Sequence, residues 1–330
     1  MNALAAKPQA ASPPQPVPAP DVRWITIDET HAGQRLDNFL LSVLKGVPKS
    51  LVYRIVRSGE VRVDKGRATP EWRLAIGQVV RIPPVRVPDR SSAPPVPGQS
   101  FPVIHEDEAL LVIDKPAGVA VHGGSGIRHG LIEQVRAARA DLKWVELVHR
   151  IDRDTSGLLL LAKTRTSLTF LHDLMRRGQV RKRYLAMAKG QWTGPEQALR
   201  FPLHAYVNAE GEKRVVVHEA GQPSGTRVRA KRQGRHPAAD LFSLLECDME
   251  TGRTHQIRVH LAHAGFPILG DDKYGDPALN RRLQAAGHRR MFLHAHKIAF
   301  AHPLDQKVCH LEAQMPEAFE RLLQESDARL

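Results

Sequence analysis

The chain has 330 residues, 42% of them hydrophobic, which is enough for about two folded domains with real cores. Lysine and arginine outnumber aspartate and glutamate by 48 to 35, which argues against a neutral metabolic enzyme and favours a polyanionic partner such as nucleic acid. Cys247 and Cys309 form no CxxC pair, so the sequence excludes a disulfide scaffold or zinc ribbon and indicates a reducing, cytoplasmic compartment. It contains no membrane-spanning run.

Two proline-rich stretches divide the chain. Residues 1–21 hold six prolines and no apolar core, which excludes a secretory signal peptide and predicts a disordered leader. Residues 87–100 have no apolar periodicity and predict a semi-stiff linker. We therefore expect domains at 22–86 and 101–322, with a short tail at 323–330.

The first domain combines short strands with two helices. A second helix is expected between Ser50, a plausible N-cap, and Gly59, and alternating apolar residues at 61–63 and 79–82 predict strands. The first helix is predicted where apolar residues recur with the spacing of one buried helix face, at Leu36, Phe39, Leu40, Val43 and Leu44.

Basic and polar side chains surround these two helices. With the segments Gly33–Asp37 and Gly59–Asp64, the unit resembles an S4 RNA-binding domain, which implies two helices and a small sheet that grip structured RNA. The alternative is a basic face that is merely solvated. The residues expected to contact RNA are Arg35, Lys45, Lys49, Ser50, Arg54, Arg57 and Arg62.

The second domain mixes predicted strands and helices. Val119–Val121 is expected to continue its first strand beyond a proline–glycine turn, and the glycine-rich loop 122–126 is interpreted as a flexible rim. Strands are predicted at 110–113, 158–161, 182–187, 214–217, 226–228 and 241–247, and helices at 131–139 and 167–177.

One segment of this domain has the composition of a reactive loop. His149–Gly157 places two carboxylates, two arginines and a histidine directly ahead of the apolar run Leu158–Leu161. The run is too short for a membrane span and suits a buried strand. The simpler alternative is a buried strand preceded by a self-paired, solvated charge cluster.

A second polar segment leads into a predicted helix. Thr254 is expected to cap this helix, which Gly265 ends. His255, His260 and His263 lie nearby, but their spacing does not suit a shared metal ion, and no metal site is predicted.

Three segments occur in a characteristic order: His149–Gly157, then Lys182–Tyr184, then Gly252–His260. With Asp114–Gly118 and the S4-like unit, they resemble the RluA-type family of RNA pseudouridine synthases over residues 22–320. The chain has isoleucine at position 151 where the family usually has leucine, an apolar replacement of similar volume. Asp154 is not expected to be catalytic.

The resemblance implies a role for each of four residues. Asp152 matches the catalytic aspartate, and Arg258 matches the basic residue that pairs with it and keeps it charged. Tyr184 matches the active-site tyrosine, and Arg150 matches the arginine that fills the gap left by the extruded base.

The resemblance also implies a fold, a reaction and a partner. We expect an α+β catalytic domain, with a largely antiparallel mixed sheet and a central cleft, that isomerises uridines of 23S ribosomal RNA to pseudouridine. The isomerisation needs no redox or phosphate energy, so no cofactor is expected, and in particular no nucleotide cofactor. Two alternatives stay open: a non-catalytic S4-type RNA-binding or ribosome-assembly factor, and a pseudouridine synthase that acts on transfer RNA.

Overall fold

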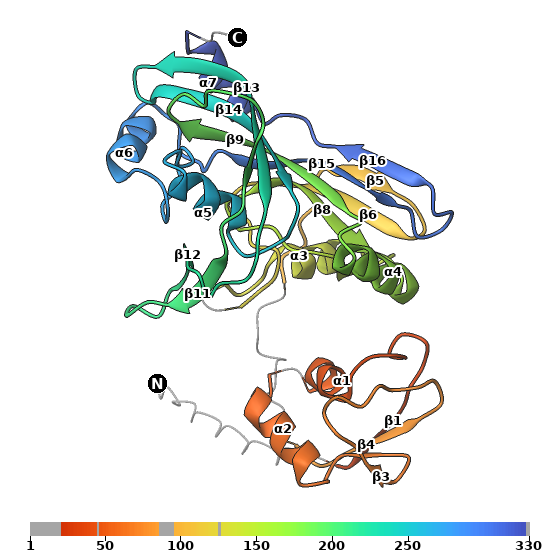
Figure 1. Cartoon of the computed structure of the whole chain (residues 1–330). Coiled ribbons are helices and arrows are strands. Elements are labelled where there is room, and N and C mark those ends of the chain that lie inside the picture. The colour runs from red at the N-terminus through yellow and green to blue at the C-terminus, as the bar shows by residue number, and fades with distance from the viewer. Residues whose placement is uncertain (1–20, 45, 86–95, 125–126, 328–330) are drawn as a thin grey trace, which may run out of the picture. The chain divides into compact units, whose positions relative to one another are not determined.

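The computed structural model describes residues 21–44, 46–85, 96–124 and 127–327 (Figure 1). Lys45, the predicted leader up to residue 20, the linker up to residue 95 and Ser125–Gly126 of the glycine-rich loop lie outside the described residues. The chain divides into two compact units, residues 1–94 and 95–330. None of the helices in the described ranges has the length and apolar character needed to cross a membrane.

The first unit contains two helices and one antiparallel sheet with strand order β1-β4-β2-β3. The first predicted helix forms where expected, and Leu36, Phe39 and Leu40 enter a closed apolar core with Val52 and Ile55 of the second. The elements are β1 (Arg23–Thr26), α1 (Leu36–Val43), α2 (Lys49–Arg57), β2 (Arg62–Val63), β3 (Gly66–Arg67) and β4 (Val79–Ile82).

The second unit is built on a ten-stranded mixed sheet with the order β10-β13-β14-β9-β15-β8-β6-β5, to which β16 and β7 add at β15 and β8. Every pairing in it is antiparallel except that between β15 and β8. Its strands are β5 (Val103–Glu106), β6 (Leu110–Lys115), β7 (Glu146–Leu147), β8 (Ser156–Ala162), β9 (Arg181–Lys189), β10 (Gln197–Leu199), β13 (Thr226–His236), β14 (Asp240–Met249), β15 (Leu293–Ala301) and β16 (Val308–Glu312).

Helices and a small hairpin complete this unit, which confirms the α+β class. The two-stranded hairpin pairs β11 with β12 in antiparallel register. The remaining elements are α3 (Leu131–Ala138), α4 (Arg165–Arg176), β11 (Leu203–Val207), β12 (Lys213–Val217), α5 (Gln256–His263), α6 (Pro277–Ala285) and α7 (Glu317–Gln324).

Strand β8 is buried along its whole length and apolar from Leu158 to Ala162, because both of its faces are covered. Leu159 and Leu161 belong to the large core cluster, whereas Leu158 and Leu160 belong to the cluster that includes Leu171 of α4. The continuous apolar run in the sequence is thus a central strand, and the loop that precedes it is fixed to the middle of the sheet.

Three local predictions were wrong. Ser50 does not cap α2, because the helix begins at Lys49 with Pro48 at the N-cap position, which places Ser50 inside the first turn. Val119–Val121 does not extend β6, because the chain leaves the sheet after Lys115 and the carbonyl of Val119 accepts a hydrogen bond from the Lys115 ammonium instead. Thr254 does not cap α5, since the N-cap position is taken by His255, whose backbone is left-handed with φ 54° and ψ 20°.

Candidate active site

Asp152 lies in the loop between β7 and β8. The backbone N–H of Thr155 donates to the carbonyl of Asp152 at 3.2 Å, closing a tight turn, and Thr155 itself is buried. The loop is tied to β6 because the Lys115 ammonium donates at 2.8 Å to the carbonyl oxygen of Arg153. These hydrogen bonds fix the backbone of the loop and therefore the position of the Asp152 carboxylate.

Backbone geometry explains why glycine is needed at position 157, where the loop meets the sheet. Its φ is +106°, and a Cβ there would lie 2.2 Å from the carbonyl oxygen of Ala295 on β15. Only glycine fits both the conformation and the close approach of the two strands. A larger residue at this position would push the Asp152 loop away from the sheet.

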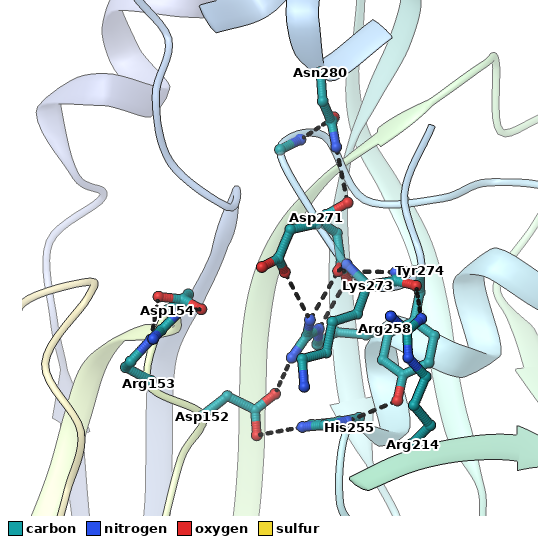
Figure 2. A network of polar contacts seen from close by, with 12 residues as sticks. Asp152, Arg153, Asp154, Arg214, His255, Arg258, Asp271, Lys273, Tyr274 and Asn280 are labelled. Carbon is teal, nitrogen blue, oxygen red and sulfur yellow. Dashed lines mark hydrogen bonds and ion pairs between the residues drawn. The ribbon is translucent and has the colours of Figure 1, made fainter. Parts of the chain in front are cut away.

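Arg258 contacts the carboxylate of Asp152, from which it is 106 positions away in the chain. Its Nη1 donates to Oδ2 of Asp152 at 3.0 Å (Figure 2). The same guanidinium forms a fork with Asp271, from Nε to Oδ2 at 2.7 Å and from Nη2 to Oδ1 at 2.8 Å. The guanidinium carbon also lies 5.1 Å from the ring centre of Tyr274.

Electrostatics keep this buried group charged. Burial opposes the positive charge of Arg258, but the hydrogen bonds and charges of Asp271 and Asp152 outweigh it and raise the pKa of Arg258. Burial likewise opposes the negative charge of Asp271, and Arg258 overcomes that effect and lowers the pKa of Asp271. The site therefore holds a fixed cation whose third contact is the catalytic candidate Asp152.

His255 faces the other oxygen of the same carboxylate. Its Nε2 lies 3.9 Å from Oδ1 of Asp152, and its Nδ1 is 2.8 Å from the hydroxyl of Tyr274 (Figure 2). That hydroxyl also accepts the backbone N–H of Val215, which leaves its own proton for Nδ1 and places the imidazole proton on Nε2. Burial lowers the pKa of His255, so the ring is neutral at physiological pH.

Tyr184 is buried in the middle of β9, opposite Cys247 on one side and Ala295 on the other. Burial raises the pKa of its hydroxyl, and the negative charge of Asp152 raises it further. The phenol is therefore protonated at neutral pH. It can offer a ring face and a hydrogen-bond donor, but it is a poor proton acceptor.

His149 and Arg150 begin the loop that carries Asp152, and their environments differ. Nε2 of His149 accepts the backbone N–H of Leu160 at 3.2 Å, which fastens the loop to β8. Arg150 is exposed at the surface. An exposed side chain can extend into bound RNA, as the predicted role of filling the gap left by the extruded base requires.

The predicted RNA-contacting residues of the first unit fall into two groups. Arg54 and Arg57 are exposed on α2 and line a shallow hollow with Ser50 and Tyr53. Arg35, in contrast, donates to both oxygens of the nearly buried Asp37, at 3.1 and 2.7 Å. Lys49 is exposed at the start of α2, and Arg62 lies in β2.

Of the three histidines considered as metal ligands, His255 faces Asp152 and His260 lies in the interior. Both ring nitrogens of His260 are hydrogen-bonded, Nδ1 to Thr226 at 3.0 Å and Nε2 to Ser224 at 2.9 Å, so this side chain belongs to the core. Two other groups have donor atoms close enough to hold a metal ion: His105, Asp107 and His302, and His236, His288 and Glu325. Neither group includes a residue of the segment 149–157 that carries Asp152.

The sequence interpretation missed two functional residues. Asp271 orients Arg258, and its only signal was a carboxylate after the buried Ile268–Leu269 pair, which is not distinctive. His255 was considered only as a metal ligand. Its position beside Asp152 depends on the left-handed backbone that ends the 250–254 segment, which no spacing rule predicts.

Comparison with known proteins identifies the family of this chain. The sequence pattern of the RNA pseudouridylate synthase family matches residues 109–263, and that of the S4 domain matches residues 34–80. Two human structures share the fold. RNA pseudouridylate synthase domain containing 1 has a TM-score of 0.58 and 23% sequence identity, and the match covers 71% of this chain and 91% of that one. RNA pseudouridylate synthase domain containing 4 has a TM-score of 0.55 and 24% sequence identity, and the match covers 69% of this chain and 94% of that one. The chain belongs to the RNA pseudouridine synthase family.

Relatives that match over nearly their whole length are named for one type of pseudouridine synthase. The ribosomal large subunit pseudouridine synthase C of Haemophilus ducreyi is 47% identical over 309 residues, which cover 92% of this chain and 95% of that protein. The protein of the same name from Escherichia coli K12 is 46% identical over 313 residues, covering 92% and 97%. The expected family and the S4-like unit are therefore confirmed.

Proposed function

We propose that this enzyme converts uridines of large-subunit ribosomal RNA to pseudouridine, with Asp152 as the nucleophile. The observation that carries the proposal is the 3.0 Å contact between Arg258 and Asp152, which joins two of the three ordered motifs. The relatives named for the ribosomal large subunit, at 46–47% identity, support the choice of substrate.

The reaction breaks the bond between N1 and C1′, turns the uracil and joins C5 to C1′. One proton leaves C5 and one arrives at N1, so the atoms balance without an external reactant. A carboxylate can attack C1′ or add to C6 of the ring. Because Oδ2 of Asp152 is bound by Arg258, Oδ1 is the oxygen left for either attack.

Two further side chains have proposed roles in base flipping, one on the extruded uridine and one in the RNA that it leaves. A flipped uridine loses its stacking partners, at a cost of a few kcal/mol. The ring of Tyr184 supplies a replacement surface, worth roughly 1 to 3 kcal/mol per stacked base. Arg150, exposed at the start of the loop, fills the space that the uridine leaves in the RNA.

The test compares Asp152→Asn with Asp154→Asn in the same loop. Asp154 pairs with its neighbour Arg153 at 3.0 Å and does not contact Arg258 within hydrogen-bond range. We expect Asp152→Asn to fold and to bind 23S ribosomal RNA but to form no pseudouridine, whereas Asp154→Asn stays active. Pseudouridine formed by Asp152→Asn would refute the assignment.

Two other functions predict different outcomes. For a non-catalytic ribosome-assembly factor, cells carrying Asp152→Asn should grow and assemble ribosomes as the wild type does, with no uridine site lost. For a transfer RNA enzyme, deletion of the gene should remove pseudouridine from transfer RNA and leave ribosomal RNA unchanged. Mapping pseudouridine in total RNA of the deletion strain separates these cases.

A further inference from the structure

Two lysines lie near the active site, Lys115 fully buried and Lys182 half-buried, and they differ in the partners of their ammonium groups. The Lys115 ammonium is completely buried and donates at 2.8 Å to each of three carbonyl oxygens, those of Pro116, Val119 and Arg153. Burial lowers the pKa of Lys115 to about 7. Its three N–H groups nevertheless all have acceptors, so Lys115 is a structural residue.

Lys182 lies on β9, two residues before Tyr184 and therefore on the same face of the sheet. Burial lowers the pKa of its ammonium, and no carboxylate compensates for that effect. Within the described ranges of the chain, its ammonium has no hydrogen-bond acceptor or ion-pair partner, and burial is the only influence on its pKa. A half-buried cation without a protein partner pays part of the cost of desolvation, which an anionic ligand would offset.

The position of this ammonium relates it to all three motifs. With His149 and Tyr184 it lines a small pocket, and its charge contributes to lowering the pKa of His149. A Cβ on Gly252 would lie 3.3 Å from Nζ of Lys182, so the ammonium also adjoins the backbone ahead of α5. The other lysine that lines the pocket, Lys297, is already paired with Glu312 at 3.0 Å.

We infer that Lys182 is a phosphate subsite, which receives a backbone phosphate of the RNA strand next to the flipped nucleotide. The inference rests on the proposed function for the identity of that strand. An ammonium is a compact point charge that suits a phosphate oxygen. Gly252 leaves room for the approach, because any side chain there would meet Nζ.

Neighbouring charge favours the same ligand. Arg150 and Arg253 are exposed in the two loops that flank Lys182 in the three-motif site. A strand of RNA that crosses these loops carries one phosphate for each nucleotide, and the uridine can turn toward Asp152 while its flanking phosphate reaches Nζ. Lys182 thereby fixes the register of the strand against the nucleophile.

The binding test uses the full-length chain with Asp152→Asn, so that no turnover interferes, and an unmodified transcript of 23S ribosomal RNA. Lys182→Met should weaken binding about tenfold at low salt and reduce the slope of log K against log salt by roughly 0.7 to 0.9, the value for one neutralised phosphate. Lys189→Met is the matched control, because Lys189 lies on the same strand but is paired with Asp276 at 2.8 Å. An unchanged affinity and slope in Lys182→Met would overturn the subsite.

Thermal unfolding without RNA separates a binding role from a structural one. Removing an unpaired, half-buried cation should leave the Tm of Lys182→Met equal to or above that of the parent. Lys115→Met should unfold at a lower temperature, because three carbonyl groups lose their donor. A Tm for Lys182→Met as low as that of Lys115→Met would also overturn the inference. The nucleophile assignment is tested separately, because it depends on whether Asp152→Asn forms pseudouridine, whereas the subsite depends on the difference in RNA affinity between Lys182→Met and its parent.

Discussion

Asp271 holds the guanidinium of Arg258 by two parallel hydrogen bonds, and this fork leaves only one edge of the guanidinium to face Asp152. Asp271 is itself fixed. Its Oδ1 accepts the backbone N–H groups of Lys273 and Tyr274, and its carbonyl accepts the side-chain amide of Asn280 at 2.8 Å (Figure 2). The direction of the Arg258–Asp152 contact is thus set by Asp271, whose side chain is buried behind the guanidinium.

Asp271→Asn should therefore impair both stability and catalysis. The substitution leaves a buried guanidinium without its main counter-charge, which typically costs about 3 to 5 kcal/mol of folding free energy. Pseudouridine formation should fall by one to two orders of magnitude at temperatures where the variant is still folded, because Arg258 is no longer aimed. Chemical denaturation and single-turnover assays measure the two effects.

Asp272→Asn is the matched control for that experiment. Asp272 is the next residue, but its carboxylate is 67% exposed and lies 3.7 Å from Arg258. A surface ion pair of this kind contributes at most about 1 kcal/mol. Equal effects of the two substitutions would mean that overall negative charge, rather than the buried fork, governs the site.

Tyr184 offers a way to separate a stacking surface from a hydroxyl group. Its hydroxyl has a raised pKa and stays protonated, so the ring face should matter more than proton transfer. Tyr184→Phe should keep RNA binding and most of the activity, whereas Tyr184→Leu should weaken the substrate complex by roughly 1 to 3 kcal/mol. Single-turnover rates and KM for both variants decide the matter. A complete loss of activity in Tyr184→Phe would instead assign the hydroxyl a chemical role.

The sequence predicted what local patterns encode. The helix at Leu36–Val43 follows from apolar spacing, and β8 follows from a short run that only a doubly covered strand can bury. Asp152, Tyr184 and Arg258 were predicted because each lies in a distinctive short motif, and Arg258 contacts Asp152, the partner that the family resemblance implied.

The parts that could not be predicted depend on tertiary contacts. Asp271 is thirteen residues from Arg258 and becomes its partner only because the 265–271 turn folds back over α5. Lys115 and Lys182 look alike in sequence, yet one finds three carbonyl acceptors and the other none in the described chain. Burial without partners is invisible to motif spacing.

The arginines of the S4-like unit should differ in whether they contribute to RNA binding or to stability. Arg54 and Arg57 are exposed on α2, so replacing both with alanine should weaken RNA binding and reduce the salt slope by roughly 0.7 to 0.9 for each phosphate that is no longer neutralised. Arg35→Ala should act mainly on stability, because Asp37 loses its cation while staying nearly buried. Binding titrations over a salt series and melting curves of the full chain distinguish the two classes. A salt slope that changes only in Arg35→Ala would reverse the division.

His149 makes the anchoring of the catalytic loop sensitive to acid. Burial, aided by the charge of Lys182, lowers the pKa of His149 from 6.5 to about 3, and Nε2 must stay unprotonated to accept the N–H of Leu160. Below pH 6.5 the unfolded chain takes up a proton that the folded chain refuses until about pH 3, so stability is full above pH 6.5 and is lost as the pH falls through this window.

His149→Gln removes this titration but keeps an acceptor, since the amide oxygen can receive the N–H of Leu160. Between pH 8 and pH 5 the wild type should lose about 2 kcal/mol more folding free energy than the variant. Urea unfolding of both proteins at the two pH values measures the difference. Equal losses would place the acid sensitivity elsewhere, and would mean that the link between Asp152 and β8 does not depend on a neutral imidazole.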